Sequence, residues 1–169
     1  MKSDAELTGL GGWLVLVGIS VVVTPFSWLL RSRETFLLPF DNEIWRPLTT
    51  EGSEIYNPLA AGIVVTNIVG NAVFIVGWIY LAILFFRKSP RFPPWFIWLN
   101  IGSLGYTLLV GIGFTVAYPG YRLFDAVPIS ELARSMLYML ITIPYLNVSR
   151  RVALTFVGRD TEKEESAAD

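Results

Sequence analysis

Residues 59–86 read LAAGIVVTNIVGNAVFIVGWIYLAILFF, a stretch without a single charged side chain. About 20 helical residues span the roughly 30 Å of hydrocarbon in a bilayer, so this stretch is long enough to cross a membrane. Comparable charge-free runs cover residues 7–30 and 92–121, and a shorter one covers residues 135–149. These runs predict an integral membrane protein built from helices.

The composition of the whole chain agrees with a membrane setting. Of the 169 residues, 53% are hydrophobic and only 16% are charged, whereas soluble domains are about a quarter charged. The chain has no His and no Cys, which excludes imidazole or thiolate metal sites, a Cys nucleophile and a Ser-His-Asp triad. The net charge of −1 argues against a nucleic-acid partner. We therefore expect no cofactor, no metal and no catalytic residue.

The runs predict an all-α fold, a bundle of four transmembrane helices with a long structured extracytoplasmic loop between the first two. The helices are expected near residues 11–30, 59–86, 94–118 and 129–148. Residues 1–156 are expected to form this single membrane domain. Residues 157–169 are expected to be a disordered cytoplasmic tail, because they are charged and rich in Ala and Ser.

The distribution of Lys and Arg predicts the orientation in the membrane. With both termini in the cytoplasm, the inner side carries Lys2, Arg87, Lys88, Arg91, Arg150, Arg151, Arg159 and Lys163, and the outer side carries Arg31, Arg33, Arg46 and Arg122. Basic residues accumulate on the cytoplasmic side of membrane proteins, so this bias favours cytoplasmic termini. The first helix taken alone points the other way, since Arg31 and Arg33 oppose Lys2.

Five of the inner cations are expected to contact anionic lipid headgroups, each with about 1 kcal/mol of attraction. They are Arg87, Lys88, Arg91, Arg150 and Arg151. Val152 and Phe156, four residues apart, are expected to continue from them as an amphipathic turn on the membrane surface.

Polar side chains follow one face of the second and third helices. Asn67 and Asn71 are one turn apart, and Asn100, Ser103 and Thr107 follow one another at spacings of three and four. An unpaired amide in hydrocarbon is costly, so these side chains should face protein or trapped water. They form either a hydrogen-bonded interface between the two helices, which we favour, or a polar cavity for a small ligand.

Charged side chains within the expected spans are Glu131 and Arg134, three residues apart and therefore neighbours on one helix face. Arg134 lies 16 residues before Arg150, or about 24 Å along a helix, so it can reach the far interface. We interpret the two as an interfacial ion pair rather than a transport or proton-relay pair.

Two segments resemble a known family. Gly9-Leu-Gly-Gly-Trp-Leu14 begins the first helix, and Pro144-Tyr-Leu-Asn-Val-Ser-Arg-Arg-Val152, followed by Thr155-Phe156, ends the fourth. With Tyr56-Asn-Pro58 between them, they resemble the bacterial "domain of unknown function 2569" membrane-protein family. The resemblance implies four transmembrane helices in a bacterial inner membrane. It carries no established activity and no catalytic residues.

Three functions are compatible with this sequence. We favour a non-enzymatic membrane module with a structural, regulatory or partner-binding role, whose partners are the lipid bilayer and either a second copy or another membrane protein. The alternative is a small-solute or ion pathway along Asn67, Asn71 and Asn100, formed by one chain or an oligomer. Such pathways usually have a charged residue at the midplane, which this chain lacks. A membrane enzyme comes third, because the loop carboxylates match no metal-binding motif.

Overall fold

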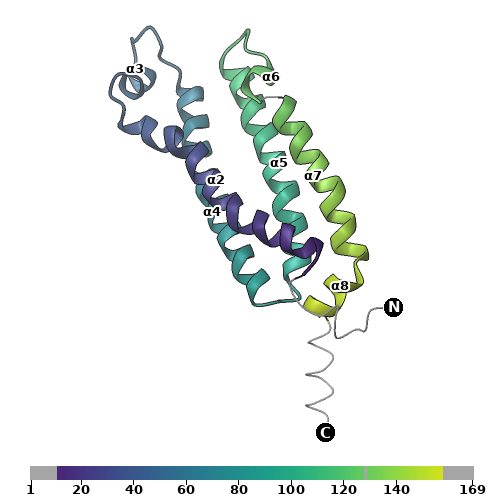
Figure 1. Cartoon of the computed structure of the whole chain (residues 1–169). Helices are drawn as coiled ribbons and strands as arrows, with labels where there is room; N and C mark the ends of the chain where they lie inside the picture. The colour runs from purple at the N-terminus through teal and green to yellow at the C-terminus, as the bar shows by residue number, and fades with distance from the viewer. Residues whose placement is uncertain (1–10, 128, 158–169) are drawn as a thin grey trace.

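The computed structural model describes residues 11–127 and 129–157, and every regular element in these ranges is a helix (Figure 1). The long helices are α2 (Trp13–Leu37), α4 (Pro58–Phe86), α5 (Phe92–Ala117) and α7 (Ile129–Val148). The short elements are the 3-10 turn η1 (Leu38–Phe40), α3 (Trp45–Thr49), α6 (Leu123–Ala126), α8 (Arg150–Val152) and the π-helical turn η2 (Ala153–Val157). The all-α class predicted from the sequence is confirmed for this part of the chain.

The first expected helix is wrong at its C-terminal end. The helix α2 continues through Arg31 to Leu37 instead of ending at Leu30, because its next turns contain no Gly or Pro before Pro39. The connection to α4 therefore covers residues 38–57 rather than 31–58, and it contains η1 and α3. The other three expected ranges agree with the observed helices to within two residues. Most of the expected tail, residues 158–169, lies outside the described residues.

Three segments are long and apolar enough to cross a membrane: α2 with η1, α4 and α5. Only 28% of the most apolar part of α2 and of α4, and 17% of that of α5, is buried inside the protein. Their apolar side chains therefore face outward over areas much larger than soluble monomers expose. This is the build of an integral membrane protein.

The four long helices pack in sequence to form the bundle. The helices α2 and α4 pack together, as do α4 with α5 and α5 with α7 (Figure 1). The elements α3 and α6 lie at one end of the molecule, which we call the loop end. The turn between α4 and α5 lies with α8 at the opposite end, which we call the basic end.

Asn57 ties two helices together at the loop end. Its side-chain oxygen caps α4 by accepting a hydrogen bond from the Ala60 backbone N–H at 3.0 Å, and its Nδ2 donates to the Ala117 carbonyl at the end of α5, at 2.8 Å. Pro58 follows at the first position of the helix, where a missing N–H costs nothing. The Tyr56-Asn-Pro58 segment therefore has a structural explanation.

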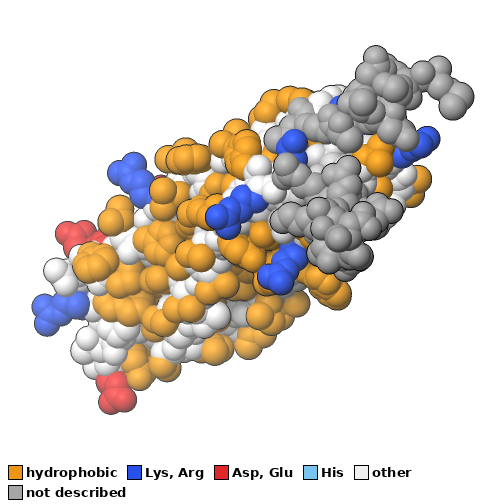
Figure 2. All heavy atoms as spheres, turned by 90° about the horizontal axis from the view of Figure 1, so that it is seen from below, with side chains coloured by type: hydrophobic (Ala, Val, Ile, Leu, Met, Phe, Trp, Pro, Cys, Tyr) orange, Lys and Arg blue, Asp and Glu red, His pale blue; other side chains and the backbone are white. Residues whose placement is uncertain are grey.

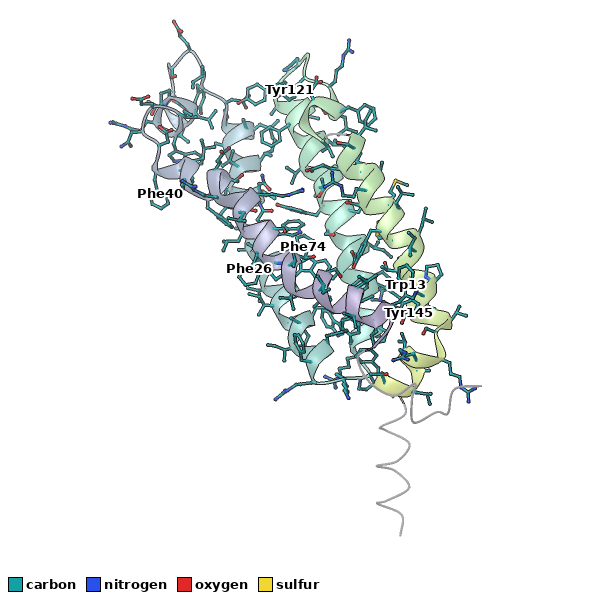
Figure 3. The ribbon with its side chains drawn as sticks, in the orientation of Figure 1. Trp13, Phe26, Phe40, Phe74, Tyr121 and Tyr145 are labelled. Atoms are coloured by element: carbon teal, nitrogen blue, oxygen red, sulfur yellow. The ribbon has the colours of Figure 1, made fainter. Side chains whose placement is uncertain are left out.

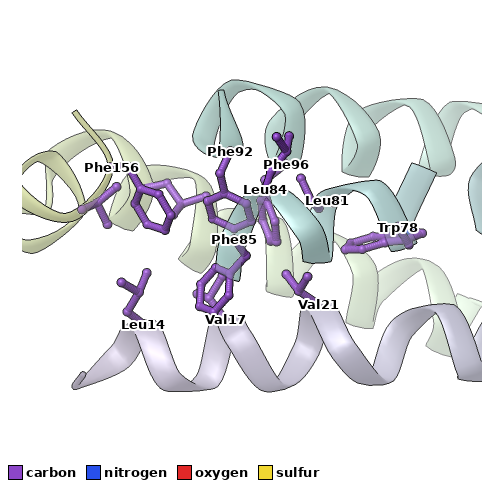
Figure 4. Close-up of a cluster of buried hydrophobic side chains, with 12 residues drawn as sticks. Leu14, Val17, Val21, Trp78, Leu81, Leu84, Phe85, Phe92, Phe96 and Phe156 are labelled. Carbon is purple, nitrogen blue, oxygen red and sulfur yellow. The ribbon is translucent and has the colours of Figure 1, made fainter. Parts of the chain in front are cut away.

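A buried aromatic cluster closes the basic end (Figure 4). Phe92 is its centre: its ring lies 4.9 Å from that of Phe156, 5.1 Å from that of Phe85 and 5.7 Å from that of Phe96. Full burial of such a side chain stabilises a fold by about 1.5–3 kcal/mol. The cluster therefore attaches the C-terminal turn η2 to the α4–α5 hairpin.

The expectation of a surface turn at Val152 and Phe156 is wrong. The two side chains are 2% and 0% exposed. The π-helical turn η2 brings the chain back under α4 and α5, where an aromatic pocket removes Phe156 from water and lipid more completely than a membrane surface would.

The two ends of the sequence motif meet at this same end. Gly12 has φ +60°, a conformation that favours glycine. A Cβ at Gly11 would lie 2.6 Å from Nη1 of Arg151, so the arginine packs directly on the segment before α2. In Figure 3, Trp13 and Tyr145 are both seen toward this end of the molecule, while Phe40 and Tyr121 mark the loop end.

The predicted headgroup-binding residues gather at the basic end. Arg87, Lys88 and Arg91 belong to the turn between α4 and α5, while Arg150 and Arg151 belong to α8. Figure 2 looks onto this end and shows Lys and Arg side chains around it, with apolar side chains over much of the remaining surface.

Candidate functional site

A partly open cavity of about 620 Å³, lined by both polar and apolar side chains, is bordered by α2, α4, α5 and α7. The five polar residues singled out in the sequence all line it: Asn67, Asn71, Asn100, Ser103 and Thr107. In the described part of the chain, no hydrogen bond joins the two asparagines of α4 to the three residues of α5. This arrangement favours the cavity over a closed polar interface.

Two amide groups leave an acceptor available to the cavity. Asn71 donates from Nδ2 to Oδ1 of Asn67 at 3.0 Å, and Asn100 donates from Nδ2 to the Phe96 carbonyl at 2.8 Å. Asn71 and Asn100 are 7% and 8% exposed. Their Oδ1 atoms accept no hydrogen bond within the described residues, so each can accept one from a ligand or from water.

Tyr106 links α5 to α4 beside these amides. Its hydroxyl donates to Asn67 and lies 3.1 Å from both the side-chain Oδ1 and the backbone oxygen of that residue. Its ring lies flat enough against α4 that a Cβ at Gly70 would overlap it. The Tyr106 ring also stands 5.1 Å from Phe74, which points into the bundle (Figure 3).

A third polar stripe, on α2, was missed in the sequence. It consists of Ser20, Thr24, Ser27, Arg31 and Thr35, all lining the cavity. Their spacings of four, three, four and four place them on one helix face. This signal was readable, but the expected helix ended at Leu30 and cut the stripe in two.

Tyr138 joins this stripe to α7. The hydroxyl proton of Ser20 is donated to the Val17 carbonyl at 2.7 Å, so the Tyr138 hydroxyl is the donor in the hydrogen bond between Tyr138 and Ser20. This contact crosses between α2 and α7 in the part of the cavity nearer the basic end.

Glu131 pairs with a different cation from the one expected. Its carboxylate lies 2.8 Å from Nη1 of Arg31, and the two side chains are 42% and 60% exposed. The extension of α2 past Leu30 keeps Arg31 on a rigid helix facing α7, which explains the change of partner. Arg134 also lines the cavity, and it forms no ion pair within residues 11–127 and 129–157.

The cavity ends in aromatic packing toward the basic end. Trp78 lines it there, is buried, and meets Phe96 edge to face at 6.0 Å. The Nε1 group of Trp78 is buried without a hydrogen-bond partner. The cationic residues predicted to bind headgroups do not border the cavity, since all of them lie beyond this aromatic layer.

The described residues contain no group of three or more carboxylates close enough to hold a metal ion. Four long helices, three of them apolar enough to span a bilayer, border a partly open cavity whose lining includes hydroxyl and amide groups. The chain therefore has the architecture of a small polytopic helical membrane protein with an internal polar site.

A protein family matches residues 7–157 of the chain, and it is described as protein of unknown function, DUF2569. The chain belongs to this family, as the motifs at its two ends indicated. No curated protein and no solved structure matches it.

Proposed function

We propose that this chain is a non-enzymatic, partner-binding protein of the bacterial inner membrane, and that its partner is a small polar ligand held in the internal cavity. The observation that carries the proposal is the pair of Asn71 and Asn100 side chains, which line the cavity and whose Oδ1 atoms have no donor among the described residues. Each of these oxygens is available to accept a hydrogen bond from a small polar ligand.

The size of the cavity fits small-molecule binding. Ligand sites in proteins commonly measure about 300–1,000 Å³, and this one measures about 620 Å³. Its chemistry fits binding better than catalysis. The hydroxyls of Thr24, Ser103 and Thr107 are committed to backbone carbonyls of their own helices, which leaves them without the adjacent general base that a nucleophile needs.

The helix α7 serves as the fourth membrane span in this proposal. Its 20 residues extend about 30 Å, the thickness of the hydrocarbon core. Met136, Leu137, Leu140 and Ile141 are exposed and form an apolar outward face. Glu131, Arg134, Ser135 and Tyr138 of α7 border the cavity, and the two charged residues lower the mean hydropathy of this helix.

Four spans place both termini on one side of the membrane. The basic end then faces the cytoplasm, where its five cations bind anionic headgroups. The Arg31–Glu131 end of the cavity faces outward. A small-solute pathway would need a second opening through the buried cluster of Phe85, Phe92, Phe96 and Phe156, so the closed inner end supports binding over passage.

Thiol chemistry tests this proposal, because the chain has no native Cys. Thr107→Cys lines the cavity, whereas Leu109→Cys, at nearly the same depth on α5, is on the exposed apolar face. In inverted and right-side-out vesicles, we expect a membrane-impermeant thiol reagent to modify Thr107→Cys from the outer side at least ten times faster than Leu109→Cys. Adding Ser103→Trp, which fills the cavity, should slow that reaction. Equally slow modification of both thiols would mean that Thr107 lies in a dry helix interface, and it would refute the proposal.

A further inference from the structure

We infer that the ligand of this cavity carries an anionic phosphate or carboxylate group, which Arg134 binds beside the Arg31–Glu131 pair. This inference rests on the proposed function, because it names the chemical class of the occupant. It goes further by assigning the two halves of the cavity to different parts of the ligand.

The first observation is the charge balance of the lining. The charged side chains bordering the cavity are Arg31, Arg134 and Glu131, which sum to one positive charge. Glu131 is committed to Arg31 at 2.8 Å. Arg134 has no ion-pair partner within the described ranges, and it lies five residues into α7, about 8 Å from the helix start. Arg134 is exposed and borders the cavity, so its guanidinium is available to bind an anion there.

The second observation is a set of hydroxyl donors that line the same cavity as Arg134. They are Ser27, Ser32, Thr35 and Ser135, and none of them makes a side-chain hydrogen bond within the described chain. Ser32 is only 4% exposed. A buried hydroxyl that is not bonded to protein can donate to an anionic oxygen, and hydrogen bonds to charged groups are the stronger kind.

The other half of the cavity has no charged side chain among its described residues. There the hydroxyls of Ser20 and Thr24 give their protons to backbone carbonyls, Asn71 and Asn100 offer Oδ1 acceptors, and Trp78 offers an Nε1 donor that has no partner within the ranges described. A ligand that fits both halves has its anionic group at the loop end, with hydroxyl or N–H donors and an acceptor toward the basic end. A phosphate ester or carboxylate bearing such donors has this pattern, either as a soluble molecule or as a lipid headgroup.

Charge-selective labelling of Thr107→Cys tests the inference. The anionic reagent sulfonatoethyl methanethiosulfonate and the cationic reagent trimethylammonioethyl methanethiosulfonate have similar sizes and react with thiols in the same way. We expect the ratio of anionic to cationic modification rates, corrected for each reagent's rate with a free thiol, to exceed that at an outer-surface cysteine such as Tyr121→Cys. Arg134→Gln should lower this ratio about ten-fold, because removing a nearby charge slows one reagent and speeds the other. Arg134→Lys should retain most of it.

The matched control is Arg33→Gln, which removes an exposed cation two residues from Arg31 that does not line the cavity. It should leave the ratio unchanged. Monodisperse elution and an unchanged thermal midpoint establish that each variant is folded. If the ratio stays the same in folded Arg134→Gln, the inference is overturned. The proposed function is unaffected by that result, because the proposed function fails only when both reagents are excluded from the cavity.

Two protection arms identify the source of the anion. Glycerol phosphate is added to the protein in phosphatidylcholine nanodiscs, and phosphatidylglycerol replaces part of the lipid in a second preparation. A soluble ligand predicts Arg134-dependent slowing of the anionic reagent by glycerol phosphate. A lipid headgroup predicts the same slowing by phosphatidylglycerol. If neither glycerol phosphate nor phosphatidylglycerol slows the anionic reagent, and the two reagents react at equal corrected rates, the inference is contradicted.

Discussion

A missing side chain allows the closest contact at the site. Gly70 on α4 leaves room for the ring of Tyr106, whose hydroxyl then donates to Asn67. That hydrogen bond keeps the Asn67 amide oriented to accept from Asn71. The geometry of two amides therefore depends on a residue that makes no polar contact itself.

Gly70→Ala is expected to destabilise the protein. Alanine is the better helix former by about 1 kcal/mol, but forcing a methyl group into a packed contact costs about 1–3 kcal/mol. We expect a lower thermal midpoint in detergent, together with faster labelling of a cavity thiol as Tyr106 is displaced. Gly105→Ala is the control, since a Cβ there meets nothing within 4 Å, and it should be neutral or stabilising. Equal midpoints for the two variants would contradict the Gly70–Tyr106 contact.

Hydropathy and periodicity in the sequence were enough to predict the positions of the long helices and their polar faces. The ranges of α4 and α5 followed from charge-free runs, and that of α7 from a shorter run extended toward Ile129. For Asn67, Asn71 and Asn100 the sequence favoured a helix interface and left a cavity as the second interpretation. The partner of Glu131 and the burial of Phe156 were not predictable in this way. Both depend on how segments more than 60 residues apart meet in space, which one-dimensional spacing does not encode.

The C-terminal turn η2 is expected to stabilise the whole bundle. Phe156→Ala removes a buried ring from the aromatic cluster and should lower the free energy of unfolding by about 3–5 kcal/mol. Phe86→Ala removes the same group from an exposed position on α4 and should change it by less than about 1 kcal/mol. The comparison is made by denaturation in detergent, and similar losses for both would mean that η2 does not dock on the cluster.

The whole molecule has two chemically different ends. The basic end combines five cations with the buried aromatic cluster, and the part of the cavity toward the loop end carries the partly exposed Arg31–Glu131 pair. In the proposed orientation, this asymmetry places the basic end in the cytoplasm and leaves the cavity open toward the outer side.

The orientation is testable with two single cysteines. Tyr121→Cys lies between α5 and α6, and Ala153→Cys is exposed in η2, at the other end of α7. In intact bacteria we expect an impermeant reagent to label Tyr121→Cys, and to label Ala153→Cys only after permeabilisation. Labelling of both sites from the same side would show that α7 does not cross the membrane.

The central claim is that one face of α4 borders a water-filled polar cavity while the opposite face borders lipid. Spin labels at Asn71→Cys and Val73→Cys, two residues apart at nearly the same depth, test this most directly in nanodiscs. Asn71 lines the cavity and Val73 is exposed on the apolar side. We predict more frequent collisions with a water-soluble nickel complex at position 71 and with oxygen at position 73. Low collision rates with both agents at position 71 would mean a dry helix interface, and would contradict the account.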